Sequence, residues 1–598
     1  MSGPARQLQT LLREARAHIE VGNSAAAYAP LHHAEGLAPS PAAWRAIGDA
    51  WHAAGNSGAG GKAHMRALKA SVRDSELVAA AEALRRDALA VAEPALRARL
   101  KAHPTDIAAI RMLGELATRL GRYGDAEKLL ARALELAPAF TPARHNLAVV
   151  LHRQARSQEA LGHVEELLVE DARNPAYRNL KAALLVRIGD YDGAIRIYRQ
   201  VLDELPDQPR VWMSLGHALK TVGKVPDSIE AYRTSIAQMP SLGESWWSLA
   251  NLKTFRFGAE DMAAIEAQLA RGDLTPDDRF HFEFALGKAL EDAGEYAASF
   301  AHYAEGNRLR RALIEYDPEE LSDQLRRATA LFTPAFFAER PGGDPAPDPI
   351  FIVGLQRSGS TLVEQILSSH PQIEGTMELP DLPAIARRLA GRRRKGGETR
   401  YPEILAELSP AERAALGREY LDLTRIQRKT DRPFFIDKLP NNFAHAGLIR
   451  LILPNARIVD VRRHAMACCF SCFKQHFARG QAFSYDLTEL GRYYCDYVGM
   501  MDVIDRALPG RVHRVLYEEL VGDLEGEVRR LLAWLGLDFD PACLAFHRTE
   551  RAVRTPSAEQ VRQPIYSDSL DQWRHYEPWL GPLAAALAPV LAAPADAP

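Results

Sequence analysis

The stretch Ile350-Phe-Ile-Val-Gly-Leu-Gln-Arg-Ser-Gly-Ser-Thr361 decides the fold of the second half of the chain. Its first four residues are apolar and mostly β-branched, which predicts a buried strand, and a helical pattern follows over 360–368. The turn between them, 354–361, has the outline of the phosphate-binding loop G-x4-G-K-[ST], with Ser360 in place of the lysine. Backbone amides and a helix N-terminus can hold an anion there, so the stretch predicts an anion site at a strand–helix junction.

The missing lysine limits which anion fits. In nucleotide triphosphatases that lysine reaches the β- and γ-phosphates, and Ser360 cannot replace its charge. The cation of this loop is Arg357. One phosphate beside an arginine suits a donor without a triphosphate tail. A tight strand–turn–helix that binds no ligand is the alternative interpretation.

The rest of the second half alternates between strands and helices. It follows a segment rich in proline and glycine, 340–349, which we interpret as a linker. Strands are predicted at 350–353, 434–436, 456–461 and 511–516, and helices at 360–368, 443–452, 465–477 and 524–535. Such apolar strands alternating with helices indicate a parallel sheet covered on both faces, with ligands at the carboxyl ends of its strands.

The first half of the chain repeats itself. Small residues recur 34 residues apart at Ala126, Ala160, Ala194 and Ser228. Three further series recur in phase with them: leucines at Leu113, Leu147, Leu180, Leu215 and Leu249, prolines at Pro138, Pro206 and Pro240, and aromatic residues at Tyr177, Trp212 and Trp246. In helical repeats, small residues let paired backbones approach and a proline ends the second helix. The pattern therefore predicts a stack of antiparallel helix pairs.

This pattern resembles the tetratricopeptide repeat (TPR) family. Clear repeats cover about 108–270, and degenerate units extend the expected all-α TPR solenoid over 1–316. Residues 317–348 are expected to form a connecting helix and the linker, and 349–598 a second, α/β domain with a central parallel sheet. The resemblance implies a concave scaffold that recruits a protein or peptide substrate or a partner. A solenoid that only stabilises or dimerises the second domain is the alternative.

Composition excludes several classes of protein. The 598 residues are 47% hydrophobic and 25% charged with a net charge of -3, which gives no sign of a nucleic-acid or membrane partner. No run is long enough for a membrane span or placed for a secretory signal, so we expect a cytoplasmic protein. Three of the five cysteines, Cys468, Cys469 and Cys472, share one apolar run. We interpret them as buried apolar side chains and expect neither a disulfide framework nor a metal site.

From about 349 to 578 the sequence resembles the sulfotransferases that use 3′-phosphoadenosine-5′-phosphosulfate (PAPS) as donor. The branch that it resembles contains the protein-tyrosine sulfotransferases and bacterial proteins that fuse a TPR array to such a domain. The resemblance implies that PAPS is the co-substrate of a P-loop-like sulfotransferase domain. It also implies which loop residues hold the 5′-phosphosulfate of the donor: Arg357, Ser358, Gly359, Ser360 and Thr361.

The second phosphate of the donor has its own signature in this family. An arginine at the end of a later strand and a serine eight residues on hold the 3′-phosphate, and Arg463 and Ser471 match them. An arginine can bind a phosphate through two parallel hydrogen bonds. Arg462 is an alternative to Arg463. Ala465 and Ala467 replace a proline and an aspartate that are usual between the two.

Sulfuryl transfer needs a general base at the acceptor hydroxyl and cations near the developing charge. The resemblance implies that Glu378 is the base, and Glu374 and Asp381 are the competing carboxylates nearby. It implies that Lys438, just past the second predicted strand, is the catalytic lysine and that Arg357 is also catalytic.

Two later residues complete the expected site. Tyr517 follows the fourth predicted strand and resembles the tyrosine that lies against the nucleotide in this family, with a core aromatic as the alternative. Ser557, three residues before Gln560, resembles a late segment that closes over the donor, where Arg562 adds charge.

The acceptor is less well defined by the sequence. Leu379 and Pro380 stand in the stretch where animal tyrosine sulfotransferases carry arginines that grip an acidic peptide, and Arg387, Arg388 and the basic run 392–395 are either a replacement or solvated surface. We expect protein tyrosine as acceptor, because a phenol with a pKa of about 10 is easily deprotonated. A carbohydrate hydroxyl is the alternative. A P-loop nucleotide kinase and a TPR adaptor with an inactive nucleotide-binding domain are the remaining hypotheses.

Overall fold

The structure is a computed structural model that describes residues 3–38, 40–252, 254–391, 399–477, 480–553, 555, 557–565 and 570–592. The chain falls into two compact units, Met1–Val201 and Leu202–Pro598. Among the described residues, no helix combines the length and the apolar character that a bilayer crossing requires.

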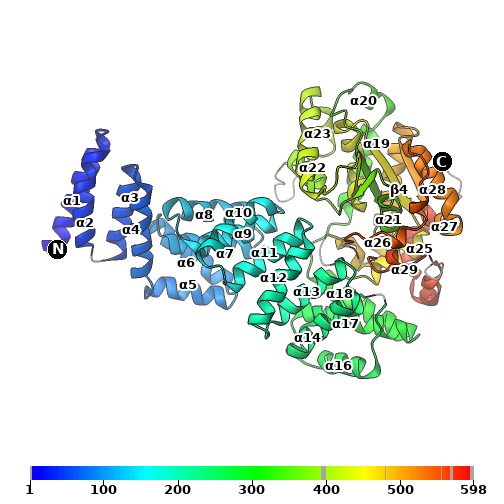
Figure 1. Ribbon diagram of the computed structural model, residues 1–598, viewed down its shortest axis with the longest axis horizontal. Helices are drawn as coiled ribbons and strands as arrows, with labels where there is room; N and C mark the ends of the chain where they lie inside the picture. Colours follow the sequence, from blue (N-terminus) through cyan, green and yellow to red (C-terminus); the bar gives the residue numbers. More distant parts are fainter. Residues whose placement is uncertain are drawn as a thin grey trace. The chain divides into compact units, whose positions relative to one another are not determined.

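The unit Met1–Val201 is a succession of helix pairs (Figure 1). Its helices are α1 (Gly3–Glu20), η1 (Ser24–Ala27), α2 (Tyr28–Leu37), α3 (Pro41–Ala53), α4 (Ser57–Ala70), α5 (Ser75–Arg85), α6 (Leu89–Ala102), α7 (Ile107–Arg119), α8 (Tyr123–Leu136), α9 (Thr141–Arg153), α10 (Ser157–Glu170), α11 (Pro175–Arg187) and the first part of α12 (Tyr191–Glu204). The repeated small residues Ala126 and Ala160 have no exposed surface. A Cβ on Gly114 of α7 would lie 2.9 Å from Cγ of Leu130 on the paired helix. The backbones of a pair approach closely because these residues are small, as their spacing predicts.

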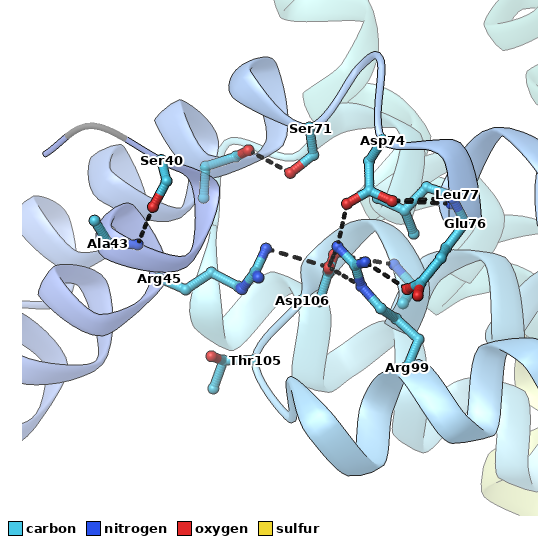
Figure 2. A network of polar contacts seen from close by, with 12 residues as sticks. Ser40, Ala43, Arg45, Ser71, Asp74, Glu76, Leu77, Arg99, Thr105 and Asp106 are labelled. Carbon is cyan, nitrogen blue, oxygen red and sulfur yellow. Dashed lines mark hydrogen bonds and ion pairs between the residues drawn. The ribbon is translucent and has the colours of Figure 1, made fainter. Parts of the chain in front are cut away.

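A buried ionic cluster joins four of these helices (Figure 2). Asp106, which caps α7, accepts hydrogen bonds from Arg45 of α3 at 3.3 Å and from Arg99 of α6 at 3.0 Å. Arg99 also donates to Asp74 at 2.7 Å and to Glu76 at 2.8 Å, at the start of α5. The side chains of Arg45 and Arg99 are each 8% exposed, and that of Asp106 is 4% exposed. One carboxylate therefore holds two buried guanidinium groups.

Removal of that carboxylate should destabilise the unit Met1–Val201. We expect Asp106→Ala to lower its free energy of unfolding by about 3–5 kcal/mol, because the two buried charges lose their shared partner. Urea denaturation of the full chain, followed by circular dichroism, measures the shift. Glu82→Ala is the matched control, because Glu82 pairs with Arg85 on the exposed surface, where ion pairs contribute little. Equal midpoints for the two variants would contradict the role of the cluster.

The unit Leu202–Pro598 holds a parallel sheet with the strand order β2-β3-β1-β4-β5 among the described residues. The strands are β1 (Pro349–Gly354), β2 (Ile373–Gly375), β3 (Phe434–Lys438), β4 (Arg457–Arg462) and β5 (Val512–Leu516). The four predicted strands are confirmed in their order along the chain. The sequence did not predict β2, because three residues at a sheet edge are too few to show a pattern.

Helices cover both faces of this sheet. They are α19 (Glu319–Leu331), α20 (Pro334–Ala338), α21 (Ser360–Ser368), α22 (Asp381–Ala390), η2 (Glu403–Ala406), α23 (Pro410–Thr424), η3 (Arg425–Gln427), η4 (Pro440–His445), α24 (Ala446–Ile452), α25 (Ala465–Phe473), η5 (Ala482–Tyr485), α26 (Leu487–Ala507), α27 (Tyr517–Gly522), α28 (Leu524–Leu535), η6 (Pro541–Cys543), η7 (Phe546–Arg548), η8 (Gln560–Arg562), η9 (Gln572–Trp579) and α29 (Gly581–Leu591). Alternate residues of β1 belong to two different apolar clusters, Ile350 and Ile352 to one and Phe351 and Val353 to the other. β1 is therefore apolar along its length because both of its faces are buried, as predicted.

Helices that precede residue 316 share this unit with the sheet (Figure 1). They are α13 (Pro209–Thr221), α14 (Val225–Gln238), α15 (Gly243–Ala250), α16 (Ala259–Leu269), α17 (Pro276–Asp292) and α18 (Tyr296–Ala312). The indole of Trp246 donates to the carbonyl of Pro240 at 3.0 Å, which joins two of the repeated residues. The amide of Asn307 on α18 donates to the carbonyl of Phe473 on α25 at 2.9 Å. The expected domain limits of 316 and 349 stay predictions, and some helices on their N-terminal side pack with the sheet.

Candidate functional site

The loop between β1 and α21 is held in an unusual backbone conformation. Its φ angles are 147° at Gly354, 69° at Arg357 and 102° at Gly359. A Cβ on Gly354 would lie 2.6 Å from the carbonyl oxygen of Val461, and one on Gly359 would lie 2.4 Å from Cδ2 of Tyr517. Both glycines are therefore required by close contacts as well as by their φ angles. Arg357 is not a glycine, and a left-handed φ at such a residue is typical of functional loops.

The guanidinium of Arg357 donates hydrogen bonds to three side chains. Its Nε donates to Ser471 Oγ at 3.1 Å, and its Nη1 donates to Ser557 Oγ at 2.5 Å. Its Nη2 donates to Gln560 Oε1 at 3.5 Å. Ser471 lies on α25 and the other two partners lie in the irregular segment after α28. Residues that the sequence analysis took from three separate motifs thus meet at one side chain.

Arg463 and Tyr517 flank the same loop. Nη1 of Arg463, which follows β4, donates to the carbonyl oxygen of Arg357 at 3.4 Å. Its guanidinium carbon lies 5.0 Å from the centroid of the Tyr517 ring, at the start of α27. Arg462, the alternative to Arg463, instead pairs through Nε with the buried Asp460 at 2.8 Å. The carboxyl ends of β1, β4 and β5 therefore meet at the position where a parallel sheet binds its ligand.

These residues surround a cavity of about 820 Å³. Most of the predicted donor-binding residues line it: Arg357, Gly359, Ser360, Thr361, Arg463, Ser471, Tyr517 and Ser557. Ser358, also a residue of the loop, is 1% exposed, and its hydroxyl makes no hydrogen bond within the described chain. Sites for nucleotide-sized ligands have volumes of roughly 300–1,000 Å³. The cavity is therefore large enough for a nucleotide.

Glu378 and Lys438 lie at a second, much smaller cavity of about 10 Å³. Nζ of Lys438, at the end of β3, donates to Glu378 Oε1 at 2.6 Å. The lysine side chain is 2% exposed and the glutamate side chain is 44% exposed. Thr361 lines the large cavity and Thr555 the small one, and their hydroxyls are hydrogen-bonded at 3.3 Å. The two cavities are thus separated by one pair of threonine side chains.

The competing carboxylates have other surroundings. Glu374 on β2 is buried, and its Oε1 accepts the backbone N–H groups of Lys429 and Thr430. Asp381 begins α22, where burial raises its pKa to about 6. Neither residue lines either cavity, whereas Glu378 lines the smaller one together with Lys438.

The sequence analysis missed Arg551, which also lines the small cavity. Its Nε donates to Gln365 Oε1 at 2.7 Å, and its Nη1 pairs with Glu364 Oε1 at 3.0 Å. Nη2 is buried and has no hydrogen-bond partner among the described residues. An arginine in an irregular segment carries no sequence signal that it folds back onto α21, so only the structure could show it.

The sequence analysis also missed one wall of the large cavity. Residues that precede position 316 provide it: Trp247, Thr254, Arg256, Lys288, Glu291, Asp292 and Tyr303. Lys474, one turn beyond Ser471, links the two sides, because its Nζ lies 2.6 Å from Glu291 Oε1. The burial of Glu291 opposes the effect of Lys474, and the pKa of Glu291 is lowered overall. Helical repeats therefore contribute charged side chains to a cavity that also holds the predicted donor site.

Of the basic residues that were candidates for binding the acceptor, Arg388 forms an ion pair with another helix. Arg388 donates through both Nη1 and Nη2 to the carboxylate of Glu419 at 2.6 Å, which ties α22 to α23. The run 392–395 lies outside the described residues. Cys468, Cys469 and Cys472 are buried on α25, as predicted for this apolar run. The thiols of Cys468 and Cys472 donate to the carbonyl oxygen of Gln356 and so hold the loop against α25.

Comparison with known proteins identifies both parts of the chain. The sequence profile of the Sulfotransferase family matches residues 349–541, and two tetratricopeptide repeat profiles match 117–184 and 179–242. The chain carries a sulfotransferase domain and tetratricopeptide repeats. The sulfotransferase profile begins at the first residue of β1 and covers the five strands, whereas Arg551, Ser557 and Gln560 lie beyond its end.

Two relatives match longer parts of the chain. An uncharacterized protein of Aquifex aeolicus is 29% identical over 420 residues, which are 69% of this chain and 54% of that protein. A Caenorhabditis briggsae protein named "Putative protein-tyrosine sulfotransferase" is 25% identical over 234 residues, 38% of this chain and 80% of that protein. The chain spans about half the length of the first of these curated relatives.

Solved structures also match each part. The sulfotransferase domain of the Synechococcus PCC 7002 olefin synthase is 21% identical, with 43% of this chain and 98% of that chain covered and a TM-score of 0.32. A tetratricopeptide repeat protein from Parabacteroides merdae is 17% identical, with 40% and 92% covered and a TM-score of 0.31.

One buried acid next to the site titrates in an unusual range. Asp437 precedes Lys438 on β3 and is completely buried. The hydroxyl of Tyr420 donates to its Oδ2 at 2.8 Å, and the amide of Asn442 donates to the same oxygen at 3.4 Å. Burial raises the pKa of Asp437 to about 8.

This acid should make the stability of the protein depend on pH. The folded pKa of Asp437, about 8, lies above the unfolded value of about 4. The stability that its proton contributes is therefore complete below about pH 4 and is lost as the pH rises from there through 8. Asp437→Asn should remove this loss. The unfolding free energy of wild type relative to the variant should then fall with pH between 4 and 8, by at most about 1.4 kcal/mol per unit. Urea denaturation across this range, with the exposed Asp422→Asn as control, measures it. A constant difference would contradict the assignment.

Proposed function

We propose that the chain is a PAPS-dependent sulfotransferase that moves a sulfuryl group to an acceptor hydroxyl. The family supports the class of enzyme, and the site supports the donor. The observation that carries the proposal is the meeting of Arg357, Ser471 and Ser557 at one cavity that Arg463 also lines. Arginines and hydroxyl groups from two strand ends suit a ligand with two separate phosphate positions.

The residues present fit that donor. The N-terminal amides of α21, the hydroxyl of Ser358 and the side chain of Arg357 would hold the 5′-phosphosulfate, since a helix N-terminus favours an anion. The unpartnered, buried hydroxyl of Ser358 is the observation that supports this assignment. Arg463 and Ser471 would hold the 3′-phosphate, and Tyr517 would lie against the nucleotide.

The chemical step would take place beside Glu378 and Lys438. Glu378 would accept the proton of the acceptor hydroxyl as the acceptor oxygen bonds to sulfur and the bond from sulfur to the 5′-phosphate oxygen breaks. Lys438 would stabilise the negative charge on the departing phosphate oxygen. Arg551 brings a second cation to the small cavity. Glu378 is half-exposed whereas Lys438 is buried, so the acceptor would approach from the side of the glutamate.

The acceptor that we propose is protein tyrosine. The likeness to the Caenorhabditis briggsae protein supports this choice, and so does the fit of a half-exposed carboxylate to a phenol, the more acidic of the two candidate hydroxyls. We also propose that the repeats recruit the protein substrate or a partner. The five free cysteines support a reducing, cytoplasmic compartment.

Loss of the base should lower turnover without loss of donor binding. We expect Glu378→Gln to decrease sulfuryl transfer by about 10²–10⁴-fold, because removal of a positioned general base has effects of this size. Binding of adenosine 3′,5′-bisphosphate, the product nucleotide, should stay within twofold of wild type. Transfer of label from sulfur-labelled PAPS to a tyrosine peptide with acidic neighbours measures turnover, with an oligosaccharide as the competing acceptor.

Asp381→Asn is the matched control for this variant, because Asp381 lines neither cavity. It should keep the wild-type rate. The assignment of the base is wrong if Asp381→Asn loses activity and Glu378→Gln does not. Label that enters only the oligosaccharide would replace tyrosine by a sugar hydroxyl as the acceptor.

A second variant tests the 3′-phosphate position. We expect Arg463→Met to weaken binding of adenosine 3′,5′-bisphosphate by about 10- to 100-fold, because hydrogen bonds to charged groups are worth about 1.5–3 kcal/mol. Binding of adenosine 5′-monophosphate, which lacks the 3′-phosphate, is the internal control and should change little. Calorimetric titration of both nucleotides measures the difference. Equal losses for the two would show that Arg463 does not contact the 3′-phosphate.

A further inference from the structure

An irregular segment covers the loop that we assign to the donor. We call residues 551–565 the strap; among its described residues, only η8 forms regular structure. Ser557 and Gln560 of the strap accept hydrogen bonds from Arg357, and Thr555 accepts one from Thr361. The strap therefore contacts the loop at Arg357, in its middle, and at Thr361, at its end.

Two residues of the strap, Val553 and Arg562, bind the same backbone carbonyl of the repeat helices. The backbone N–H of Val553 donates to the carbonyl oxygen of Thr221 at 3.1 Å, and Nη2 of Arg562 donates to the same oxygen at 2.9 Å. Thr221 is the last residue of α13. A Cβ on Gly223, two residues on, would lie 2.8 Å from Nε of Arg562. The turn after α13 is thus shaped to receive both ends of the strap.

The middle of the strap has a third anchor at Glu559. This residue is 4% exposed, and it lies between Ser557 and Gln560 in the sequence. Its Oε2 accepts the backbone N–H of Thr254 at 3.1 Å and the hydroxyl of Thr254 at 2.7 Å. Thr254 lies between α15 and α16 and lines the large cavity. A buried carboxylate needs such partners, because leaving one unsatisfied costs free energy.

Charges reinforce this anchor. Lys220 of α13 interacts electrostatically with both Glu559 and Arg357. Burial and the positive charge of Arg357 lower the pKa of Lys220 to about 8, and Glu559 opposes this shift. Lys220 thus provides a cation, and Thr254 two hydrogen-bond donors, for Glu559. Glu559 in turn lies in the sequence between Ser557 and Gln560, the two strap residues that bind Arg357.

We propose that Thr254 and Glu559 are positioning residues through which the helical repeats hold Arg357 in its donor-binding geometry. The inference rests on the proposed function, because it takes the Arg357 loop as the donor site. Thr254 fixes Glu559, Glu559 fixes Ser557 and Gln560, and these fix the guanidinium. An arginine with four flexible bonds loses less entropy on binding when such contacts already hold it. The repeats therefore set donor affinity as well as offering a surface for partners.

The test uses variants of the full chain that change one hydroxyl group. Thr254→Val removes the hydrogen bond to Glu559 at nearly constant shape, and Thr254→Ser restores the hydroxyl. Thr234→Val is the matched control, because the hydroxyl of Thr234 donates only to the carbonyl of Glu230 within α14. The measurements are the Kd of adenosine 3′,5′-bisphosphate by calorimetry, KM for PAPS, kcat and the melting temperature.

We expect Thr254→Val to weaken bisphosphate binding and to raise KM for PAPS by about 3- to 10-fold, since one hydrogen bond to a charged group is lost and one from the backbone remains. The value of kcat should change less than twofold, because Glu378 and Lys438 keep their places. Thr254→Ser and Thr234→Val should bind as wild type does. A role in stability alone would lower the melting temperature without this separation of KM from kcat.

Two results would overturn the inference alone, and a third would overturn the proposed function together with it. If Thr254→Val is well folded and binds the bisphosphate as wild type does, the link does not exist. If Thr254→Val is unstable, Glu559→Gln gives the second measurement, because it keeps the size of the side chain and removes its charge; unchanged binding in that variant also refutes the link. If wild type itself does not bind the bisphosphate, the donor assignment fails and the link is refuted with it.

Discussion

The contacts of the Arg357 guanidinium are the constraint on which the site depends. This arginine has a left-handed backbone, and its side chain reaches a helix after β4 and a segment that follows almost 200 residues later. The loop can take this conformation because Gly354 and Gly359 allow the backbone to approach Val461 and Tyr517. A cation held within a loop of backbone amides concentrates positive potential at one end of the cavity. The remaining features of the site are arranged around that position.

The separation into two cavities is the second organising feature. Groups suited to hold phosphates line the larger cavity, and the Glu378–Lys438 pair lines the smaller one. The contact between Thr361 and Thr555 lies between them. Glu378 does not line the larger cavity, although the carboxylates of Glu291, Asp292 and Glu559 do. Such a layout suits a transfer between two ligands that approach from different sides.

The helical repeats within Leu202–Pro598 are part of the architecture of this site. The ion pair between Lys474 and Glu291, which also accepts the hydroxyl of Tyr303 at 2.8 Å, joins α25 to α17 near the large cavity. Breaking a buried ion pair costs free energy because it leaves an uncompensated charge, so this pair holds α25 against α17. The charged side chains of α17 are therefore explained by contacts with the sheet domain as much as by any ligand of the repeats.

The sequence by itself determined the elements and most of the residues that meet at the site. Apolar runs predicted β1, β3, β4 and β5, the 34-residue spacing predicted the helix pairs, and the loop pattern singled out Arg357. Arg463 and Ser471 were implied by the resemblance to the sulfotransferases. These features are visible because each depends on residues that are close together in the chain, where periodicity and spacing carry information.

Only the tertiary structure decided which distant side chains share those positions. Arg551, Glu559 and Thr254 lie in irregular segments without a periodic pattern, so their contacts depend on how those segments fold back on α21 and on each other. The structure also decided the role of Glu374, a competing candidate for the base in the sequence, whose carboxylate accepts hydrogen bonds from two backbone N–H groups. The choice between Arg462 and Arg463 also depended on tertiary contacts. Arg462, the last residue of β4, pairs with the buried Asp460, whereas Arg463 follows the strand and donates to the carbonyl oxygen of Arg357.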